Sequence, residues 1–422
     1  MVSVPATGWY RIHVKMVRSR HADPEAEVSY LLRNFLVVSI GDSYASGEGV
    51  PDRPGNPHGF DPGWSLWDLI PEHAVLTLLN EIVEEVKDWL KLKFTTLTQV
   101  AEGTLEMDTE PTWLEKEAHR SLNSGPALAA RLLEDLQQGD VVSFLSFARS
   151  GAEVWKGLLE PRRSGDLWAG GLGQLDELQQ ELGDQHIDAL LISVGGNDIG
   201  FSGRLADLVG KDSPSIWMLL LTELSSLVVD DSDENRERVR DMIEEALLEL
   251  DRALVDLADA VGVLNVGQVY LTEYPMAMFD QVRNGKVEVG SGCEIFSSLM
   301  FNADIDSKDA KLIKEMGQSL NDKLKAFCDD KPSWFYVDGI AEGFAGHGYC
   351  TGDESFYVRA EESFAIQGDG KGTMHPNAGG LAVYARRIAE MVREHTIETR
   401  PVFDENGKPI DTSQFESGVL ES

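Results

Sequence analysis

The stretch FLVVSIGDS, residues 35–43, indicates the fold of this chain. It begins with a continuous apolar run rich in β-branched side chains, as in a strand that is buried on both faces. Similar runs recur further along, at residues 141–147, 189–194, 263–271 and 334–337. Helical patterns separate the runs. This alternation predicts an α/β fold, with a parallel sheet and helices on both of its faces.

Three segments show the apolar periodicity of helices that bury one face. They are Asp233–Val261, Ala378–His395 and Val75–Leu92. The last of them lies between the first two predicted strands, in a connection much longer than the roughly 30 residues of a βαβ unit. We therefore expect helical insertions at about 64–118 and 201–231, the second of which contains the apolar run IWMLLL.

The length of 422 residues suits one large domain with insertions, because no Pro-, Gly- or Ser-rich linker divides the chain. We place an N-terminal extension at residues 1–30 and the α/β domain at residues 31–396. Residues 397–422 are polar and are expected to form a tail.

The net charge of −35, from 37 basic and 72 acidic side chains, disfavours polyanionic partners. A nucleic-acid-binding protein needs a basic surface, and an anionic membrane would repel this chain. The sequence contains no apolar run of about eighteen residues, so no transmembrane helix is expected. Met1–Glu27 lacks the apolar middle of a signal peptide. We expect a cytoplasmic protein, or a secreted one whose leader has been removed.

The three cysteines, Cys293, Cys328 and Cys350, are too far apart in the sequence for a CxxC metal or redox pair. Buried thiols are the first interpretation. The alternative is one disulfide with a leftover thiol, for which Cys328 with Cys350 is the preferred pairing, and it would imply an oxidising compartment.

Two short segments carry the residue types of a serine hydrolase. Ser43 follows a buried strand, where open α/β sheets bind their ligands, and the small residues around it allow it to start a helix. The alternative for Ser43 is a helix cap in an ordinary connection. His375 precedes the last predicted helix, from where it could reach Ser43, although a lone loop histidine is often structural.

Two further segments offer N–H donors after the next strands. Gly151, in ARSGA (148–152), allows the backbone to approach a reacting carbonyl, and its alternative is an ordinary loop glycine. Asn197, in VGGND (194–198), can offer its side-chain amide to an oxyanion, and its alternative is a turn. A phosphate-binding loop is disfavoured there because no lysine follows.

Together and in this order, the four residues resemble the signature of the SGNH hydrolases, also called GDSL lipases and esterases. The resemblance runs from Phe35 to about Arg387. The segments HRS (119–121) and FAGHG (344–348) are similar to parts of the family's actinobacterial secreted branch. Residues 51–118 carry none of these motifs.

The resemblance implies a flavodoxin-like three-layer α/β/α fold and hydrolysis of carboxylic esters through an acyl-serine. It implies that Ser43 is the nucleophile and that its own N–H belongs to the oxyanion hole. His375 would be general base and then general acid. Gly151 and Asn197 would complete the oxyanion hole. The resemblance implies no metal and no other cofactor.

The sequence departs from the family at the position of the catalytic acid. Many members carry an aspartate three residues before the histidine, and here that residue is Gly372. In one interpretation, Ser43 and His375 form a dyad and the Gly372 carbonyl orients the imidazole. In the other, Asp369 or Asp353 reaches the ring from the loop. We prefer the dyad.

Two other residues resemble catalytic ones but have simpler interpretations. Asp42 stands beside the nucleophile and is expected to hydrogen-bond backbone N–H groups of the turn. His347 lies in a Gly-rich loop and is expected to be structural, because no second serine motif remains for it to serve.

A small-molecule or lipid-like ester is the expected substrate, with the apolar insertions walling a groove for an acyl chain beside Ser43. In the alternative, the insertions pack on each other or across a dimer. Carbohydrate acetyl esters are a second substrate class, suggested by tryptophans between the first and third strands: Trp64, Trp67, Trp113, Trp155 and Trp168. A non-catalytic binding domain on the same fold is a third hypothesis.

Overall fold

The structure is a computed structural model of the chain. The residues that it describes are 8–15, 25–57, 107–136, 140–161, 171–201, 233–276, 278–283, 286–289, 293–298, 301–305, 307–399, 402–403 and 409–410. The predicted helix Val75–Leu92 and the run IWMLLL lie outside these residues, as does most of both predicted insertions.

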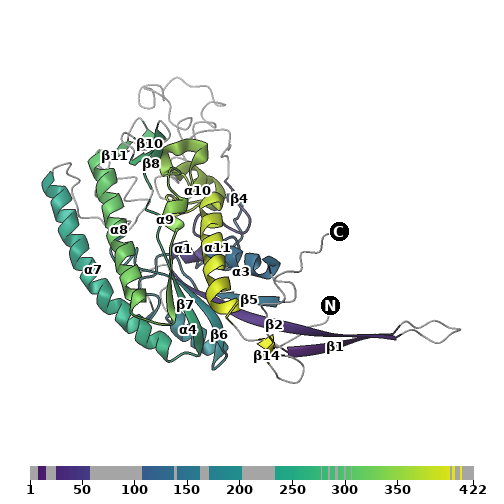
Figure 1. The fold of residues 1–422 in the computed structure, drawn as a ribbon. Coiled ribbons are helices and arrows are strands. Elements are labelled where there is room, and N and C mark those ends of the chain that lie inside the picture. Colours follow the sequence, from purple (N-terminus) through teal and green to yellow (C-terminus); the bar gives the residue numbers. More distant parts are fainter. Residues whose placement is uncertain are drawn as a thin grey trace, which may run out of the picture.

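Five parallel strands form the centre of the described part of the chain (Figure 1). Their spatial order is β5 (Asp140–Ser146), β2 (Glu25–Gly41), β6 (Ile187–Ser193), β7 (Val266–Thr272) and β12 (Trp334–Val337). Numbered along the chain, this is the order 2-1-3-4-5 of flavodoxin-like folds. Each predicted apolar run overlaps one of these strands, so the predicted α/β fold with a parallel sheet is confirmed.

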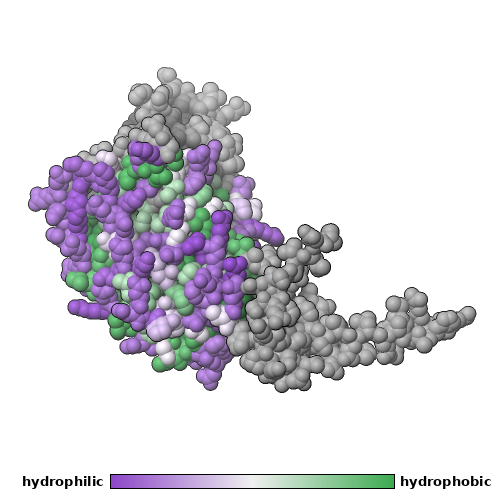
Figure 2. Space-filling model, viewed as in Figure 1, coloured by the Kyte–Doolittle hydropathy of each residue, from purple (hydrophilic) through white to green (hydrophobic). Residues whose placement is uncertain are grey.

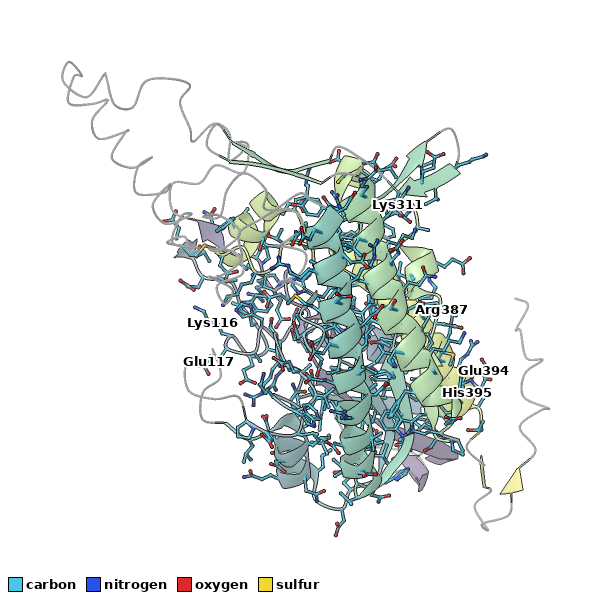
Figure 3. The ribbon with its side chains drawn as sticks, turned by 90° about the vertical axis from the view of Figure 1, so that its left-hand side faces the viewer. Lys116, Glu117, Lys311, Arg387, Glu394 and His395 are labelled. Atoms are coloured by element: carbon cyan, nitrogen blue, oxygen red, sulfur yellow. The ribbon has the colours of Figure 1, made fainter. Side chains whose placement is uncertain are left out.

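Helices cover both faces of the sheet and complete the three layers. On one side α3 (Gly125–Leu136) packs against α11 (Ala378–Val392), and on the other α7 (Asp233–Gly262) lies beside α8 (Ser307–Asp329) (Figures 1 and 3). The prediction of a long helix from Asp233 is confirmed.

Shorter elements surround these layers. The helices are α1 (Ser43–Ser46), α4 (Gln174–Leu182), α9 (Ile340–Gly343), η2 (Tyr349–Glu354), α10 (Ala360–Gln367) and η3 (Arg393–Ile397). The antiparallel strand pairs are β3 (Asn56–Pro57) with β4 (Met107–Thr109), β8 (Asp280–Arg283) with β9 (Lys286–Val289), β10 (Cys293–Ser298) with β11 (Phe301–Ile305), and β13 (Val402–Phe403) with β14 (Pro409–Ile410).

The apolar run 263–271 begins before its strand does. Helix α7 ends at Gly262, and the next residues form the turn into β7, where the Val263 side chain is 84% exposed. The buried part of the strand begins at Val269. An apolar residue in a tight connection therefore has the same appearance in the sequence as the core strand that follows it.

The expected N-terminal extension includes a strand that joins the sheet. β1 (Gly8–Lys15) pairs antiparallel with the first half of β2, and this two-stranded arm projects from the layered body (Figure 1). β2 continues without interruption from the arm into the parallel sheet, so residue 30 lies within a strand.

The first interpretation, buried thiols, holds for Cys328 but is wrong for Cys350, and the alternative pairing of these two cysteines is also wrong. Cys350 is disulfide-bonded, whereas Cys328 is a free, buried thiol, so these two residues do not pair. Cys328 follows Leu320 and Leu324 at helical spacing on the buried face of α8, and this position keeps its thiol in the core. Burial raises the pKa of Cys328 to about 12.

The visible surface of the described part is mostly hydrophilic. Figure 2 shows hydrophilic residues over the helical face of the described part, with small apolar patches between the helices. In the ranges given above, no helix is long and apolar enough to cross a membrane.

Candidate active site

A sharp turn at the end of β2 places Ser43 at the start of the short helix α1. Asp42 caps this helix, and its side chain accepts a hydrogen bond from a backbone N–H of the first turn at 3.0 Å, as expected from the sequence. Gly41 enters the turn with a φ of +136°, and a Cβ there would lie 2.2 Å from the carbonyl oxygen of Ser193 in β6. Only glycine allows β2 to come this close to β6.

His375 lies in the segment before α11 and meets Ser43. Its Nε2 is 2.8 Å from Ser43 Oγ, which is hydrogen-bonding distance. Two backbone hydrogen bonds fix the histidine: its N–H donates to the Gly372 carbonyl at 3.0 Å, and its carbonyl accepts from the Val358 N–H at 2.8 Å. The structure thus brings together two candidate residues that are 332 positions apart in the sequence.

Neither candidate aspartate contacts the imidazole. Nδ1 of His375 is buried and has no side-chain hydrogen-bond partner within the described part of the chain, whereas the backbone carbonyls of residues 371–373 act on the ring. Asp369 accepts hydrogen bonds from the Gln367 side chain at 2.5 Å and from the Lys371 N–H at 3.0 Å. Asp353 is exposed in η2.

The backbone around Gly372 leaves no room for a side chain at this position. A Cβ on Gly372 would lie 2.6 Å from Gly49 Cα and 2.9 Å from Ser363 Oγ. Burial lowers the pKa of His375 below its ordinary value, while the charge of Glu48 and nearby backbone carbonyls oppose this effect. The acid of many family members therefore has no counterpart at this place in the chain.

The two candidate oxyanion donors lie in loops that are hydrogen-bonded together. The Asn197 side chain donates to the Ala152 carbonyl at 3.0 Å, and the Asp198 side chain accepts from the Val154 N–H at 3.0 Å. Gly151, next to Ala152, has a φ of +78°. Asn197 lines the same cavity as the serine and the histidine, whereas Gly151 is not among the residues that line it.

Tyr274, which the sequence analysis did not single out, connects the serine turn to the asparagine loop. Its hydroxyl donates a hydrogen bond to the Asp42 carboxylate and accepts one from the Gly196 N–H at 3.2 Å. Ser193 Oγ also donates to Asp42, at 3.1 Å. Burial raises the pKa of Asp42 to about 6, although these hydrogen bonds favour its ionised form. The sequence signal that could have identified Tyr274 is its position just after β7, at the carboxyl end of a predicted strand.

A cavity of about 80 Å³ opens beside Ser43 and His375. Its apolar wall comes from the end of the asparagine loop, from the segment after β7 and from α8: Phe201, Pro275, Met276, Met278 and Leu320. Its polar wall includes Asn197, Lys371 and Thr373. A small, mostly apolar hollow with a few polar groups at one end suits an apolar chain attached to a polar group.

A second polar cluster lies close to the histidine and was also missed. The side chain of Glu48 is buried, and its carboxylate contacts His119 Nδ1 at 2.7 and 2.8 Å and Gln367 Nε2 at 2.8 Å. Burial alone would raise the pKa of Glu48, but the charge and hydrogen bonds of His119 hold it well below its usual range. In turn, Glu48 raises the pKa of His119 above its ordinary value, against the effect of burial.

Several other candidates lie away from this cavity. His347 stacks on Phe356 with 3.9 Å between the ring centroids, and its Nδ1 donates to the Glu354 carbonyl at 2.7 Å, as a structural histidine does. Trp113 stacks on His119 with 4.7 Å between the ring centroids. The indole N–H of Trp155 donates a hydrogen bond to the Asp256 side chain at 2.8 Å. Neither tryptophan lines the cavity. Trp64, Trp67 and Trp168 lie outside the described residues. Among the residues that the structure describes, no cluster of side chains suits a metal ion.

Known proteins resemble this chain in structure rather than in sequence. No protein-family model and no curated protein matches the sequence. The phospholipase A1 from Streptomyces albidoflavus NA297 aligns over 84% of this chain and 98% of its own, with 16% identity and a TM-score of 0.46. The extracellular lipase from Streptomyces rimosus aligns over 86% of this chain and 100% of its own, with 16% identity and a TM-score of 0.43.

The aryl esterase of M. smegmatis aligns over 86% of this chain and 99% of its own, with 11% identity and a TM-score of 0.34. Similarities at this level carry no argument about a reaction, which must rest on the geometry around Ser43. Structural matches to lipases and esterases thus extend over most of the chain and accompany the SGNH motifs found in its sequence.

Proposed function

We propose that this chain is a serine hydrolase that cleaves carboxylic esters through an acyl-serine intermediate. The observation that carries the proposal is the contact of 2.8 Å between Ser43 Oγ and His375 Nε2 at the edge of a largely apolar cavity. A serine hydrogen-bonded to a half-buried histidine suits a nucleophile with its base. A structural serine would have no need of a cavity.

In the proposed reaction, His375 takes the proton of Ser43 as the oxygen attacks the ester carbonyl. The Ser43 N–H, the Gly151 N–H and the Asn197 side chain would stabilise the oxyanion, which exists only in the tetrahedral state. His375 then returns the proton to the departing alcohol. A water molecule, deprotonated by the same ring, releases the acid from the serine.

The apolar wall of the cavity favours an acyl chain as the group that is bound. Each buried methylene contributes roughly 0.8 kcal/mol, so a chain that fills the cavity binds much better than acetate. Carbohydrate acetyl esters remain the second substrate class to test. Neither Trp113 nor Trp155, the two described tryptophans of the predicted cluster, lines the cavity to offer a sugar platform.

The nucleophile is tested by substitution and by labelling. Ser43→Ala should lower ester hydrolysis by several orders of magnitude and abolish covalent labelling by a fluorophosphonate, with an unchanged circular dichroism spectrum. Ser46→Ala, on the same short helix, is the matched control and should retain both activities. Labelling that survives in Ser43→Ala would contradict the proposal.

The substrate class is tested with p-nitrophenyl esters of increasing chain length, beside acetylated xylan and a phospholipid. We expect kcat/KM to rise several-fold per added carbon until the cavity is full and then to fall. A profile that falls from acetate onward would contradict the acyl preference and favour carbohydrate acetyl esters.

A further inference from the structure

The proposed reaction creates a positive charge that the structure must stabilise. When Ser43 gives up its proton, His375 becomes an imidazolium, and in a full triad a carboxylate on Nδ1 stabilises that charge. Here Nδ1 of His375 is buried and no carboxylate binds it within the described part of the chain, although the backbone carbonyls of residues 371–373 act on the ring. The contact between Gly372 and Gly49 also leaves no space for an acid at position 372.

Glu48 supplies a negative charge from behind this contact. It directly precedes Gly49, its exposed fraction is 1%, and its charge favours the protonated form of His375. Water screens a buried charge much less than an exposed one. A carboxylate at this place can therefore stabilise the imidazolium through its charge, without a direct hydrogen bond.

The carboxylate of Glu48 is also held in a fixed position. His119 Nδ1 binds it at 2.7 and 2.8 Å, and the Gln367 side chain donates to it at 2.8 Å. Gln367 is itself fixed, because its Oε1 accepts from the Gly49 N–H at 3.1 Å. Asp369 and Lys371 are the other charged groups that act on this cluster.

We propose that Glu48 is a positioning residue that takes the place of the triad acid. Its carboxylate, fixed by His119 and Gln367, stabilises the His375 imidazolium through space. This inference rests on the proposed function, because in the reaction the imidazolium forms when Ser43 transfers its proton to His375. The proton moves from Ser43 Oγ to His375 Nε2 and back, and Glu48 stays ionised throughout.

The variant Glu48→Gln removes the charge and keeps the size and hydrogen-bonding capacity of the side chain. The pKa of His375, followed by NMR of the imidazole, should fall by roughly 0.5–1 unit, because Glu48 favours the protonated ring. The acid limb of kcat/KM should move to lower pH by the same amount. The value of kcat should fall roughly 3–10-fold with little change in KM, because the weaker base holds the proton less well.

Two further variants distinguish the effect of the lost Glu48 charge from damage to the fold. Asp369→Asn neutralises a neighbouring carboxylate of the same cluster and should leave the pKa of His375 and the pH profile nearly unchanged. The double variant Glu48→Gln/His119→Asn replaces the ion pair with two neutral amides, and it should reproduce the lowered pKa of His375 without leaving an unpaired buried charge. Circular dichroism checks that each variant is folded.

The NMR titration needs no substrate, so the two proposals fail in different ways. Absent turnover of every ester by the unsubstituted protein would contradict the proposed function. A pKa of His375 that stays unchanged or rises in both Glu48 variants would overturn the role of Glu48. An equal fall in Asp369→Asn would also overturn it, since the effect would then be a general response to lost negative charge.

Discussion

Replacing Gly372 with aspartate restores the acid of many SGNH hydrolases in the sequence, yet we expect it to impair this protein. A Cβ at this position would lie 2.6 Å from Gly49 Cα, 2.9 Å from Ser363 Oγ and 3.1 Å from Gln367 Oε1. The first contact is with backbone, and the hydroxyl of Ser363 is fixed because it donates to the Asp369 carbonyl at 2.7 Å. Neither neighbour can move aside cheaply.

The size of the effect follows from these contacts. Overpacking of this kind costs about 1–3 kcal/mol. The added carboxylate would also lie near those of Glu48 and Asp369, and a shift of about one pKa unit from such repulsion adds about 1.4 kcal/mol. The sum, roughly 2–4 kcal/mol, is a large part of a typical folding free energy of about 5–15 kcal/mol. The variant should fold but unfold at a clearly lower urea concentration.

Activity should fall with stability, because the Gly372 carbonyl accepts the His375 N–H at 3.0 Å. A displaced carbonyl moves the imidazole away from Ser43, and we expect kcat/KM to drop at least about tenfold. Urea unfolding followed by tryptophan fluorescence and hydrolysis of a p-nitrophenyl ester measure the two effects. Gly372→Ala is the control for the steric part alone. An unchanged urea midpoint together with a raised kcat in Gly372→Asp would refute the reasoning.

Three further outcomes are expected. Asn197→Ala should lower kcat roughly 100-fold with little change in KM, since the hydrogen bond to the oxyanion forms only in the tetrahedral state. Steady-state kinetics measure both constants. An effect on KM alone would indicate that Asn197 binds the substrate in the ground state instead. The acid limb of kcat/KM should lie below pH 6.5, because burial lowers the pKa of His375 and only the neutral ring accepts a proton. A pH–rate profile with its acid limb above pH 6.5 would contradict this expectation. Gly41→Ala should destabilise the protein by roughly 3 kcal/mol or more, because the new Cβ would lie 2.2 Å from the Ser193 carbonyl oxygen and the backbone φ of residue 41 is +136°. A urea midpoint close to that of the unsubstituted protein would contradict this expectation and show that the turn can relax.

The parts of the molecule that follow simple periodic patterns were predictable from the sequence. Buried parallel strands are continuous apolar runs, and such runs located β2, β5, β6, β7 and β12. The carboxyl ends of parallel strands share one edge of the sheet. For this reason, the sequence alone predicts that Ser43 and Asn197 lie near each other, and both line the observed cavity.

The interactions that were missed join residues that no periodic pattern relates. Glu48 and His119 are 71 positions apart, and each belongs to a loop. Tyr274 is one tyrosine after a strand, and its bond to Asp42 spans 232 positions. The buried thiol of Cys328 was predictable, because its helical spacing from Leu324 indicates a core position, whereas the disulfide bond of Cys350 was not the first interpretation.

The separation of Ser43 and His375 in the chain determines when during folding the proposed active site can be assembled. The two residues are 332 positions apart, and β6, β7 and β12 of the parallel sheet lie between them in the chain. Contacts between distant segments form late, because closing long loops is entropically unfavourable. During refolding, helical signal should therefore return before catalytic competence, and a chain released from the ribosome short of its last helix would be inert.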